Sequence, residues 1–161
     1  MPMEKIVLNA SPLILLCNSE LSFILPALFP EIVVPEAVWQ EIVNGSQFDQ
    51  AAQMLPELVW LKQVSVTPVP DVVRWDLGPG ETEVLSYALE HSSFTPVIDD
   101  MLAKKCARSL GLQTMGTGTA LILAKERGLI ESVEQSLRTL QNAGLWISEP
   151  IIQLLKGKAG E

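Results

Sequence analysis

The sequence predicts an α/β fold built around a mainly parallel sheet. Two observations favour this class: short apolar runs alternate with amphipathic stretches, and no repeat or low-complexity tract interrupts the alternation. The chain has 161 residues, of which 48% are hydrophobic, so it can bury one sizeable core and is not expected to be disordered. We therefore expect a single domain over residues 1–155 and a frayed tail over residues 156–161.

The N-terminal half opens with the apolar run Lys5–Leu8, which predicts the first strand. A helix follows, with Pro12 in its first turn, where proline is tolerated. A second strand over Glu31–Val34 leads into a helix over residues 35–43, which an Asn-Gly pair ends. The remaining segments are a short helix over Leu21–Phe29, a helix over Gln47–Leu55 and a mixed, extended stretch over Leu58–Thr67.

The C-terminal half begins after a proline-rich loop over Pro68–Trp75. Gly78–Gly80 opens a helix over Glu81–Glu90. The strand Thr95–Ile98 leads into a helix over Asp100–Leu110, which a glycine ends. The elements expected after it are a last core strand over Leu112–Met115, a helix that follows Gly116–Thr119 and ends at Gly128, a helix over Glu131–Asn142 and an edge strand over Leu145–Ile147.

Charge and cysteine content exclude several classes of protein. The net charge of −8 argues against passive nucleic-acid binding through a basic surface, but a carboxylate metal site is itself acidic until its cation binds. Cys17 and Cys106 lie far apart in apolar surroundings and are expected to be buried free thiols. His91 is the one histidine, so structural zinc and His-based catalysis are not expected. Apolar runs too short for a membrane span and the absence of a signal-like start predict a cytoplasmic protein.

Two adjacent carboxylates, Asp99 and Asp100, stand where an apolar strand ends and a helix begins. Ligands of open α/β sheets bind at this edge, outside the carboxyl ends of the strands. Hard oxygen donors at such a place point to Mg²⁺ or Mn²⁺, which ligand type alone does not separate. Asp is also a favoured helix N-cap, so a capping role stays open.

Helical phase selects the acids that face inward. Glu81 lies four residues before Leu85, on the apolar stripe of its helix, although the positive end of the helix dipole also favours an acid there. Asp99 stands in phase with Ala103, whereas Asp100 falls toward the edge of the stripe. We therefore expect Glu81 and Asp99 to be metal ligands, with Asp100 as a cap or a second ligand.

Further polar groups follow the first and the last predicted core strands. Asn9 offers a carbonyl oxygen to a cation, although an Asx turn or a cap explains it as well. The run Thr114–Thr119 offers hydroxyls and backbone N–H groups that could cradle a phosphate at a helix N-terminus. It lacks the lysine and the spacing of a P-loop, and ordinary turn and capping chemistry also explains it.

Several of these segments follow one another in a recognisable order. They are Asn9–Ile14, Val34–Trp39 with Glu41, Gly80–Glu83, Ile98–Asp100 with Ala103, Ala107 and Arg108, Thr114–Thr117, and Ala124–Ile130. The ordered set resembles the PIN-like domain superfamily, and in particular a prokaryotic branch of predicted nucleic-acid-binding proteins related to VapC-type toxins. The match runs over most of the chain, and its specificity comes from the order because each segment alone is short.

The resemblance implies a three-layer α/β/α PIN-like fold around a central, mainly parallel sheet of four to five strands. PIN nucleases cluster three or four acids around Mg²⁺ or Mn²⁺ and cut single-stranded RNA by attack of water on phosphorus. By position, Glu81 and Asp99 match the second and third acids, and Asn9 stands where the first acid usually lies. The Thr114–Thr117 region stands where a fourth acid often lies, so two negative charges are missing, which weakens a divalent site.

The leading hypothesis is a metal-dependent endoribonuclease of toxin type that acts on single-stranded RNA. Glu81, Asp99 and Asn9 would be catalytic, and Glu81, Asp99 and Asp100 would bind Mg²⁺ or Mn²⁺. The residues expected to contact nucleic acid or an anion are Ser11, Lys104, Arg108, Thr114, Gly116 and Thr117. An ordinary solvated helix face explains Lys104 and Arg108 as well.

Two other functions stay open. One is a catalytically impaired PIN-fold module that binds RNA or a protein partner such as an antitoxin. The other is a doubly wound domain that binds a small anion at Gly116–Thr119. The resemblance also implies a homodimer. The tryptophans show no spacing that suggests base stacking, and Trp75 is expected to be the most exposed of them.

Overall fold

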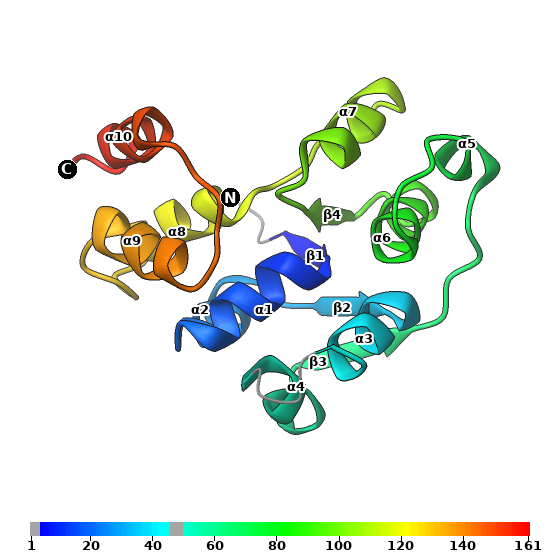
Figure 1. Ribbon diagram of the computed structural model, residues 1–161, viewed down its shortest axis with the longest axis horizontal. Helices are drawn as coiled ribbons and strands as arrows, with labels where there is room; N and C mark the ends of the chain where they lie inside the picture. Colours follow the sequence, from blue (N-terminus) through cyan, green and yellow to red (C-terminus); the bar gives the residue numbers. More distant parts are fainter. Residues whose placement is uncertain (1–3, 46–49) are drawn as a thin grey trace.

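The structure, a computed structural model, describes residues 4–45 and 50–161. Its centre is a four-stranded, all-parallel sheet in the order β3-β2-β1-β4, flanked by helices (Figure 1). The strands are β1 (Lys5–Leu8), β2 (Ile32–Pro35), β3 (Leu61–Val64) and β4 (Phe94–Val97). The α/β class and the parallel sheet that the sequence predicts are therefore confirmed.

Helices follow nearly every strand along the chain. They are α1 (Ala10–Asn18), α2 (Ile24–Leu28), α3 (Glu36–Val43), α4 (Gln50–Met54), the 3₁₀ turn η1 (Leu55–Glu57), α5 (Pro70–Val73), α6 (Pro79–Glu90), α7 (Met101–Ser109), α8 (Thr117–Glu126), α9 (Val133–Asn142) and α10 (Glu149–Lys158). Helix α5 is one turn inside the stretch that was expected to be a loop. The start of the predicted helix over Gln47–Leu55 lies outside the described residues, and α4 covers its next part.

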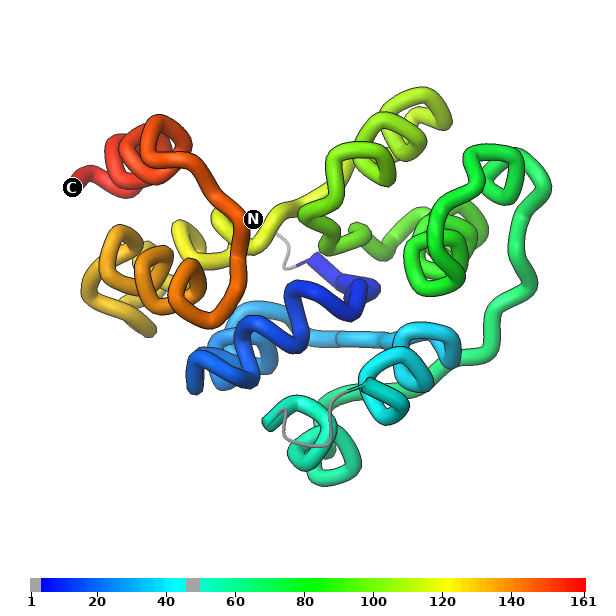
Figure 2. The backbone as a smooth tube through the Cα atoms, viewed as in Figure 1, coloured from blue at the N-terminus to red at the C-terminus, as the bar shows by residue number. Residues whose placement is uncertain are grey.

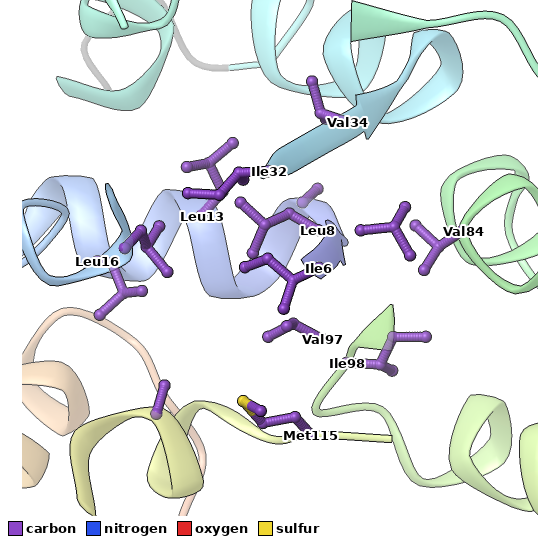
Figure 3. Packing of buried hydrophobic residues seen from close by; sticks show 14 of the residues in the cluster. Ile6, Leu8, Leu13, Leu16, Ile32, Val34, Val84, Val97, Ile98 and Met115 are labelled. Carbon is purple, nitrogen blue, oxygen red and sulfur yellow. The ribbon is translucent and has the colours of Figure 1, made fainter. Parts of the chain in front are cut away.

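The core gathers around β1, which pairs with β2 along one edge and with β4 along the other. Ile6 and Leu8 are fully buried and lie among side chains of α1, β2, α6 and β4 (Figure 3). Because central strands of a parallel sheet are covered on both faces, they read as continuous apolar runs rather than as alternating patterns. Cys17 and Cys106 are buried free thiols, as predicted.

The predicted strand over Leu112–Met115 is reduced to an isolated bridge between Val97 and Met115. The Met115 N–H donates to the Pro96 carbonyl at 2.9 Å, and the Ile98 N–H donates to the Met115 carbonyl at 2.9 Å. The next bond of such a parallel ladder would need an N–H at position 96, which proline does not have. The expected edge strand over Leu145–Ile147 is also absent from the described residues, where this segment joins α9 to α10 without strand pairing.

The C-terminal residues differ from the frayed tail that the sequence suggested. Residues 156–158 belong to α10, which packs on α8 and α9 at one end of the molecule (Figure 2). The Glu161 carboxylate accepts hydrogen bonds from the backbone N–H of Val133 at 2.5 Å and from Lys125 Nζ at 2.9 Å. These tertiary contacts order a segment whose own sequence is polar and rich in glycine. No helix among the described residues combines the length and apolar character that a membrane span requires.

Candidate functional site

The carboxyl ends of β1 and β4 bring two predicted site residues to one edge of the sheet. The two strands are neighbours, with Leu8 in register with Val97. The backbone N–H of Asn9 donates to the Val97 carbonyl at 3.2 Å. Asn9 therefore follows β1 beside the segment that carries Asp99, at the edge where parallel sheets bind their ligands.

Glu81 joins Asn9 from the first turn of α6. Gly78 is the N-cap, Pro79 is at the start of the helix, where its fixed backbone angle fits, and the Thr82 hydroxyl donates to the Gly78 carbonyl at 2.9 Å. The Asn9 side-chain Nδ2 donates to Glu81 Oε1 at 3.4 Å. Asn9 is 2% exposed, and its Oδ1 has no hydrogen-bond partner in the described part of the chain. The site therefore holds a buried acceptor that this part of the protein leaves unsatisfied.

Glu41 also lies at this edge of the sheet, beside Asn9 and Glu81. From the sequence it was named only as part of a segment that resembles the PIN-like family. Its Oε2 and the Asn9 Oδ1 lie 3.1 and 3.4 Å from the point where a Cβ on Gly80 would stand, so the missing side chain of Gly80 lets them approach. Burial raises the pKa of the Glu41 carboxyl, and the neighbouring Glu81 carboxylate raises it further. The available signal was its helical position, three residues after the buried Val38.

Asp99 is inward, as its phase predicts, but its oxygens are engaged by the start of α8. Asp99 Oδ1 accepts from the Thr117 backbone N–H at 2.9 Å, and Oδ2 accepts from the Thr117 hydroxyl at 2.6 Å. Asp99 Oδ1 and Lys104 Nζ lie 3.2 and 3.6 Å from the point where a Cβ on Gly116 would stand. Asp99 is therefore an anchored carboxylate with a cationic side chain close by.

The neighbouring acids cap helices. Asp100 is the N-cap of α7 and accepts from the Ala103 N–H at 2.9 Å, so the capping alternative for Asp100 is confirmed. Glu83, on α6, accepts from the Ala37 N–H at 3.0 Å and so caps the first turn of α3. Asn9 stands at the N-cap position of α1 without a side-chain cap bond, which leaves its amide for Glu81.

A cavity of about 740 Å³ opens at this edge of the sheet. The predicted site residues that line it are Asn9, Ser11, Glu81, Asp99, Asp100, Lys104 and Gly116. The lining does not include Arg108, Thr114 or Thr117, because Arg108 is on the last turn of α7 and the Thr117 hydroxyl faces Asp99. A smaller hollow adjoins the cavity; it shares Asn9 and Glu81 and adds Glu41.

The outer wall of the cavity comes from the segment that joins α9 to α10 and from α10 itself, seen beside the start of α8 in Figure 1. Trp146 in this segment is 92% exposed, whereas Trp75 is half-buried. The expectation that Trp75 is the most exposed tryptophan is therefore wrong. Trp75 packs against the core beneath the proline-rich stretch, and this cover was not visible in the sequence.

The donors on one side of the cleft fit a hard cation. Across residues 4–45 and 50–161, no three His, Cys, Asp or Glu residues stand close enough together to hold a metal ion. A cation there would bind the Glu41 and Glu81 carboxylates and the unsatisfied Asn9 Oδ1, with solvent completing its shell. Mg²⁺ commonly binds through one or two carboxylates and keeps several waters, so this donor set suits it.

The parallel sheet and the polar cleft at its carboxyl edge define an α/β domain of the PIN type. The PIN domain family DUF3368 matches residues 5–161, and the chain belongs to this family. The resemblance drawn from the ordered segments is thereby confirmed. PIN domains typically use divalent metal ions. A comparison with curated proteins finds no match.

Proposed function

We propose that this protein is a metal-dependent endoribonuclease of toxin type that cuts single-stranded RNA. The observation that carries the proposal is the unsatisfied, buried Asn9 Oδ1 beside Glu81 and Glu41. Burial raises the pKa of Glu41, and repulsion from the neighbouring Glu81 carboxylate raises it further. A divalent ion relieves this repulsion and satisfies the amide oxygen at the same time.

The residues around the cleft have separate roles in this proposal. Asn9, Glu41 and Glu81 would hold Mg²⁺ or Mn²⁺, which would stabilise the charge that develops at phosphorus and favour attack by water. Thr117 fixes the Asp99 carboxylate in the lining of the cavity, where Asp99 would act as a proton acceptor. Lys104 contributes the positive charge that draws a phosphate into the cavity.

Calorimetric titration with Mn²⁺ tests the metal site directly. Saturable binding to the wild type should be lost in Glu81→Gln and in Glu41→Gln. Glu90→Gln is the matched control, because Glu90 is an exposed residue of the same helix as Glu81 and does not line the cavity. No saturable binding to the wild type, or full binding to Glu81→Gln, would overturn the proposed metal site.

The reaction is tested by incubating single-stranded RNA with the wild type and the same variants. Cleavage that needs Mn²⁺ or Mg²⁺, disappears in Glu81→Gln and persists in Glu90→Gln is expected. Asp99→Asn keeps an acceptor for one Thr117 bond but removes the charge, so it should fold and lose cleavage. Cleavage that persists in chelator, or in Glu81→Gln, would be due to a contaminant or to another site.

The second candidate function is a catalytically impaired PIN-fold module that binds RNA or a protein partner such as an antitoxin. Asn9 in the place of an acid and the engagement of both Asp99 oxygens by Thr117 favour it. RNA binding without cleavage at saturating Mn²⁺ would support this candidate over the nuclease. A homodimer is also proposed on family resemblance, and light scattering of the purified protein measures it.

A further inference from the structure

We propose that the outer part of the cavity is a nucleotide subsite, in which Trp146 stacks a nucleobase and Lys104 contacts the adjoining phosphate. This inference rests on the proposed function, since it places a stretch of the RNA strand beside the candidate metal site. Trp146, Lys104, Glu81 and Asp99 line one and the same cavity. A strand that has a phosphate near the carboxylates can therefore place a neighbouring base against the indole ring.

The exposure of Trp146 is the first argument. Its side chain is 92% exposed, although it lines the wall of a cavity, and the other tryptophans are half-buried. An indole has the largest apolar surface of any side chain, so leaving it in water forfeits the free energy that burial would give. A flat π-face left open at a polar cleft suits base stacking, which is tolerant of sequence because every base has such a face.

The wall that carries Trp146 is fixed at both ends, which makes it a platform rather than a loose loop. Before Trp146, the Leu145 N–H donates to the Leu140 carbonyl at 2.9 Å, and directly after it Gln141 Nε2 donates to the Ile147 carbonyl at 3.2 Å. After it, Arg138 pairs with both carboxylate oxygens of Glu149 at 2.6 and 2.5 Å. Pre-organised aromatic surfaces lose little conformational entropy on binding, so a base can stack without first ordering this segment.

Helix α10 anchors the same wall against the start of α8. A Cβ on Gly118 would stand 2.7 Å from Leu155 Cδ1, so the two helices approach closely at this glycine. Gly118 and Thr119, in the first turn of α8, line the same cavity as Trp146. The positive end of the helix dipole there adds to the charge of Lys104.

Charge is unevenly distributed along the cavity, whose described lining holds one lysine and three carboxylates, Glu81, Asp99 and Asp100. Among the described residues that line the cavity, Lys104 is the one cationic side chain, and its Nζ lies beside Gly116 and Asp99. The adjoining hollow, in contrast, presents Glu41 and Glu81 and no lysine or arginine. A cation suits the carboxylates of the hollow, and the phosphate of a nucleotide suits the ammonium group of Lys104.

A base can stack on Trp146 only when it is not already stacked within a duplex. The subsite therefore favours single-stranded over double-stranded nucleic acid, and it does so without a preference for a particular base. Trp146 would act as a positioning residue that holds the strand across the cleft. It touches the strand away from the bond that would be cut.

The test is fluorescence anisotropy of a short labelled oligoadenylate, measured in chelator and again in Ca²⁺. Trp146→Ala should weaken binding about tenfold, the loss expected for one stacked base, whereas Trp146→Phe should retain most of the affinity. Leu154→Ala is the matched control, since it shortens an exposed apolar side chain of α10 that does not line the cavity, and it should bind like the wild type. Melting temperatures should be unchanged, because Trp146 makes few contacts that could support the fold.

Salt dependence separates the two contacts of the subsite. Lys104→Ala should lower the slope of log affinity against log salt by about 0.7, the value for one phosphate contact on a single strand. Trp146→Ala should leave this slope unchanged. An oligonucleotide with an abasic position should bind the wild type and Trp146→Ala equally.

Each result supports or overturns the subsite independently of catalysis. If the wild type binds no oligonucleotide in either buffer, or Trp146→Ala binds as tightly as the wild type, the subsite is overturned even when RNA is cleaved. If Trp146→Ala instead dissociates a dimer in light scattering, Trp146 belongs to a protein interface and the subsite is overturned. Trp146-dependent binding with no Mn²⁺ uptake would keep the subsite and reject the proposed nuclease.

Discussion

Glu41 lies on α3 and Glu161 lies beyond the end of α10, and the surroundings of these two carboxylates shift their pKa values in opposite directions. Burial and the nearby Glu81 carboxylate raise the pKa of Glu41. Burial acts in the same sense on Glu161, but hydrogen bonds from Lys125, from two backbone N–H groups at the start of α9 and from Ser132 lower its pKa to about 2. The two regions differ in the number of donors that the protein supplies.

This difference distinguishes a carboxylate that stabilises the fold from one that the proposed metal site would use. Hydrogen bonds to the charged form favour it, and a neighbouring like charge disfavours it. Asp99 resembles Glu161, because Thr117 supplies donors to both of its oxygens. Asn9 Oδ1 resembles Glu41, because no described group donates to it. The cleft therefore has a satisfied side and an unsatisfied side, and the unsatisfied side gains most from a cation.

Replacing Asp99 with Ala tests the satisfied side and should give the largest change in stability. The change removes both acceptors of Thr117, whose side chain is buried, so the free energy of unfolding should fall by about 1–3 kcal/mol. Urea denaturation measures this loss. Thr117→Val is the matched variant, and the losses of the two variants should not add in the double variant. Unchanged stability of Asp99→Ala, or full additivity, would contradict the anchoring role.

Gly80→Ala tests the unsatisfied side by crowding it. The new Cβ would stand 3.1 Å from Glu41 Oε2 and 3.3 Å from Val38 Cγ2, so both would have to give way, and it would touch Asn9 Oδ1 at 3.4 Å. We expect Mn²⁺ affinity to fall roughly tenfold in calorimetry, equivalent to about 1.4 kcal/mol. Gly157→Ala in α10 is the control, because no atom lies within 4 Å of its added Cβ. Equal Mn²⁺ affinity in wild type and Gly80→Ala would mean that these oxygens do not bind the ion.

Glu161→Gln tests the region where donors are plentiful. Because its folded pKa of about 2 lies below the ordinary 4.5, the stabilisation is complete above pH 4.5 and is lost as the pH falls toward 2. The variant should melt about 2–4 °C lower at neutral pH, the shift for losing one helix cap in a chain of this size. Its stability should also vary less with pH across this range. Glu126→Gln, an exposed change on α8, should match the wild type in scanning calorimetry.

Local patterns predicted most of the fold, and long-range pairing explains the misses. The apolar run Lys5–Leu8 and the glycine and proline signals around α6 mark elements that the structure confirms. The prediction of a strand over Leu112–Met115 is wrong because Pro96, on the neighbouring strand, lacks the N–H that would extend the hydrogen-bond ladder between the two segments. Helix α10 was missed because ion pairs such as that of Arg138 with Glu149 join residues whose proximity depends on the fold.

Only those site residues could be predicted whose position follows from the pattern of a single helix or from the end of a single strand. Helical phase was enough to place Glu81 and Asp99 on inward faces. The helical position of Glu41 after the buried Val38 hints at an inward carboxylate, but its meeting with Asn9 at Gly80 depends on the packing of α3 against α6. Trp146 lines the cleft because of the way α10 packs, so its exposure could be recognised only in the structure.

Glu41→Gln should have the smallest effect on stability, and the effect should have the opposite sign. Since the folded pKa of Glu41 is raised above 4.5, its charged form destabilises the fold at neutral pH, and this penalty disappears as the pH falls below 4.5. The neutral amide should raise the melting temperature by about 1–2 °C at neutral pH while Mn²⁺ binding is lost. Glu36→Gln on the same helix should lower it instead, because Glu36 lies at the positive end of the helix dipole. A Glu41→Gln protein less stable than the wild type at neutral pH would show that the protein satisfies this carboxylate, and would remove the electrostatic reason for a cation at the site.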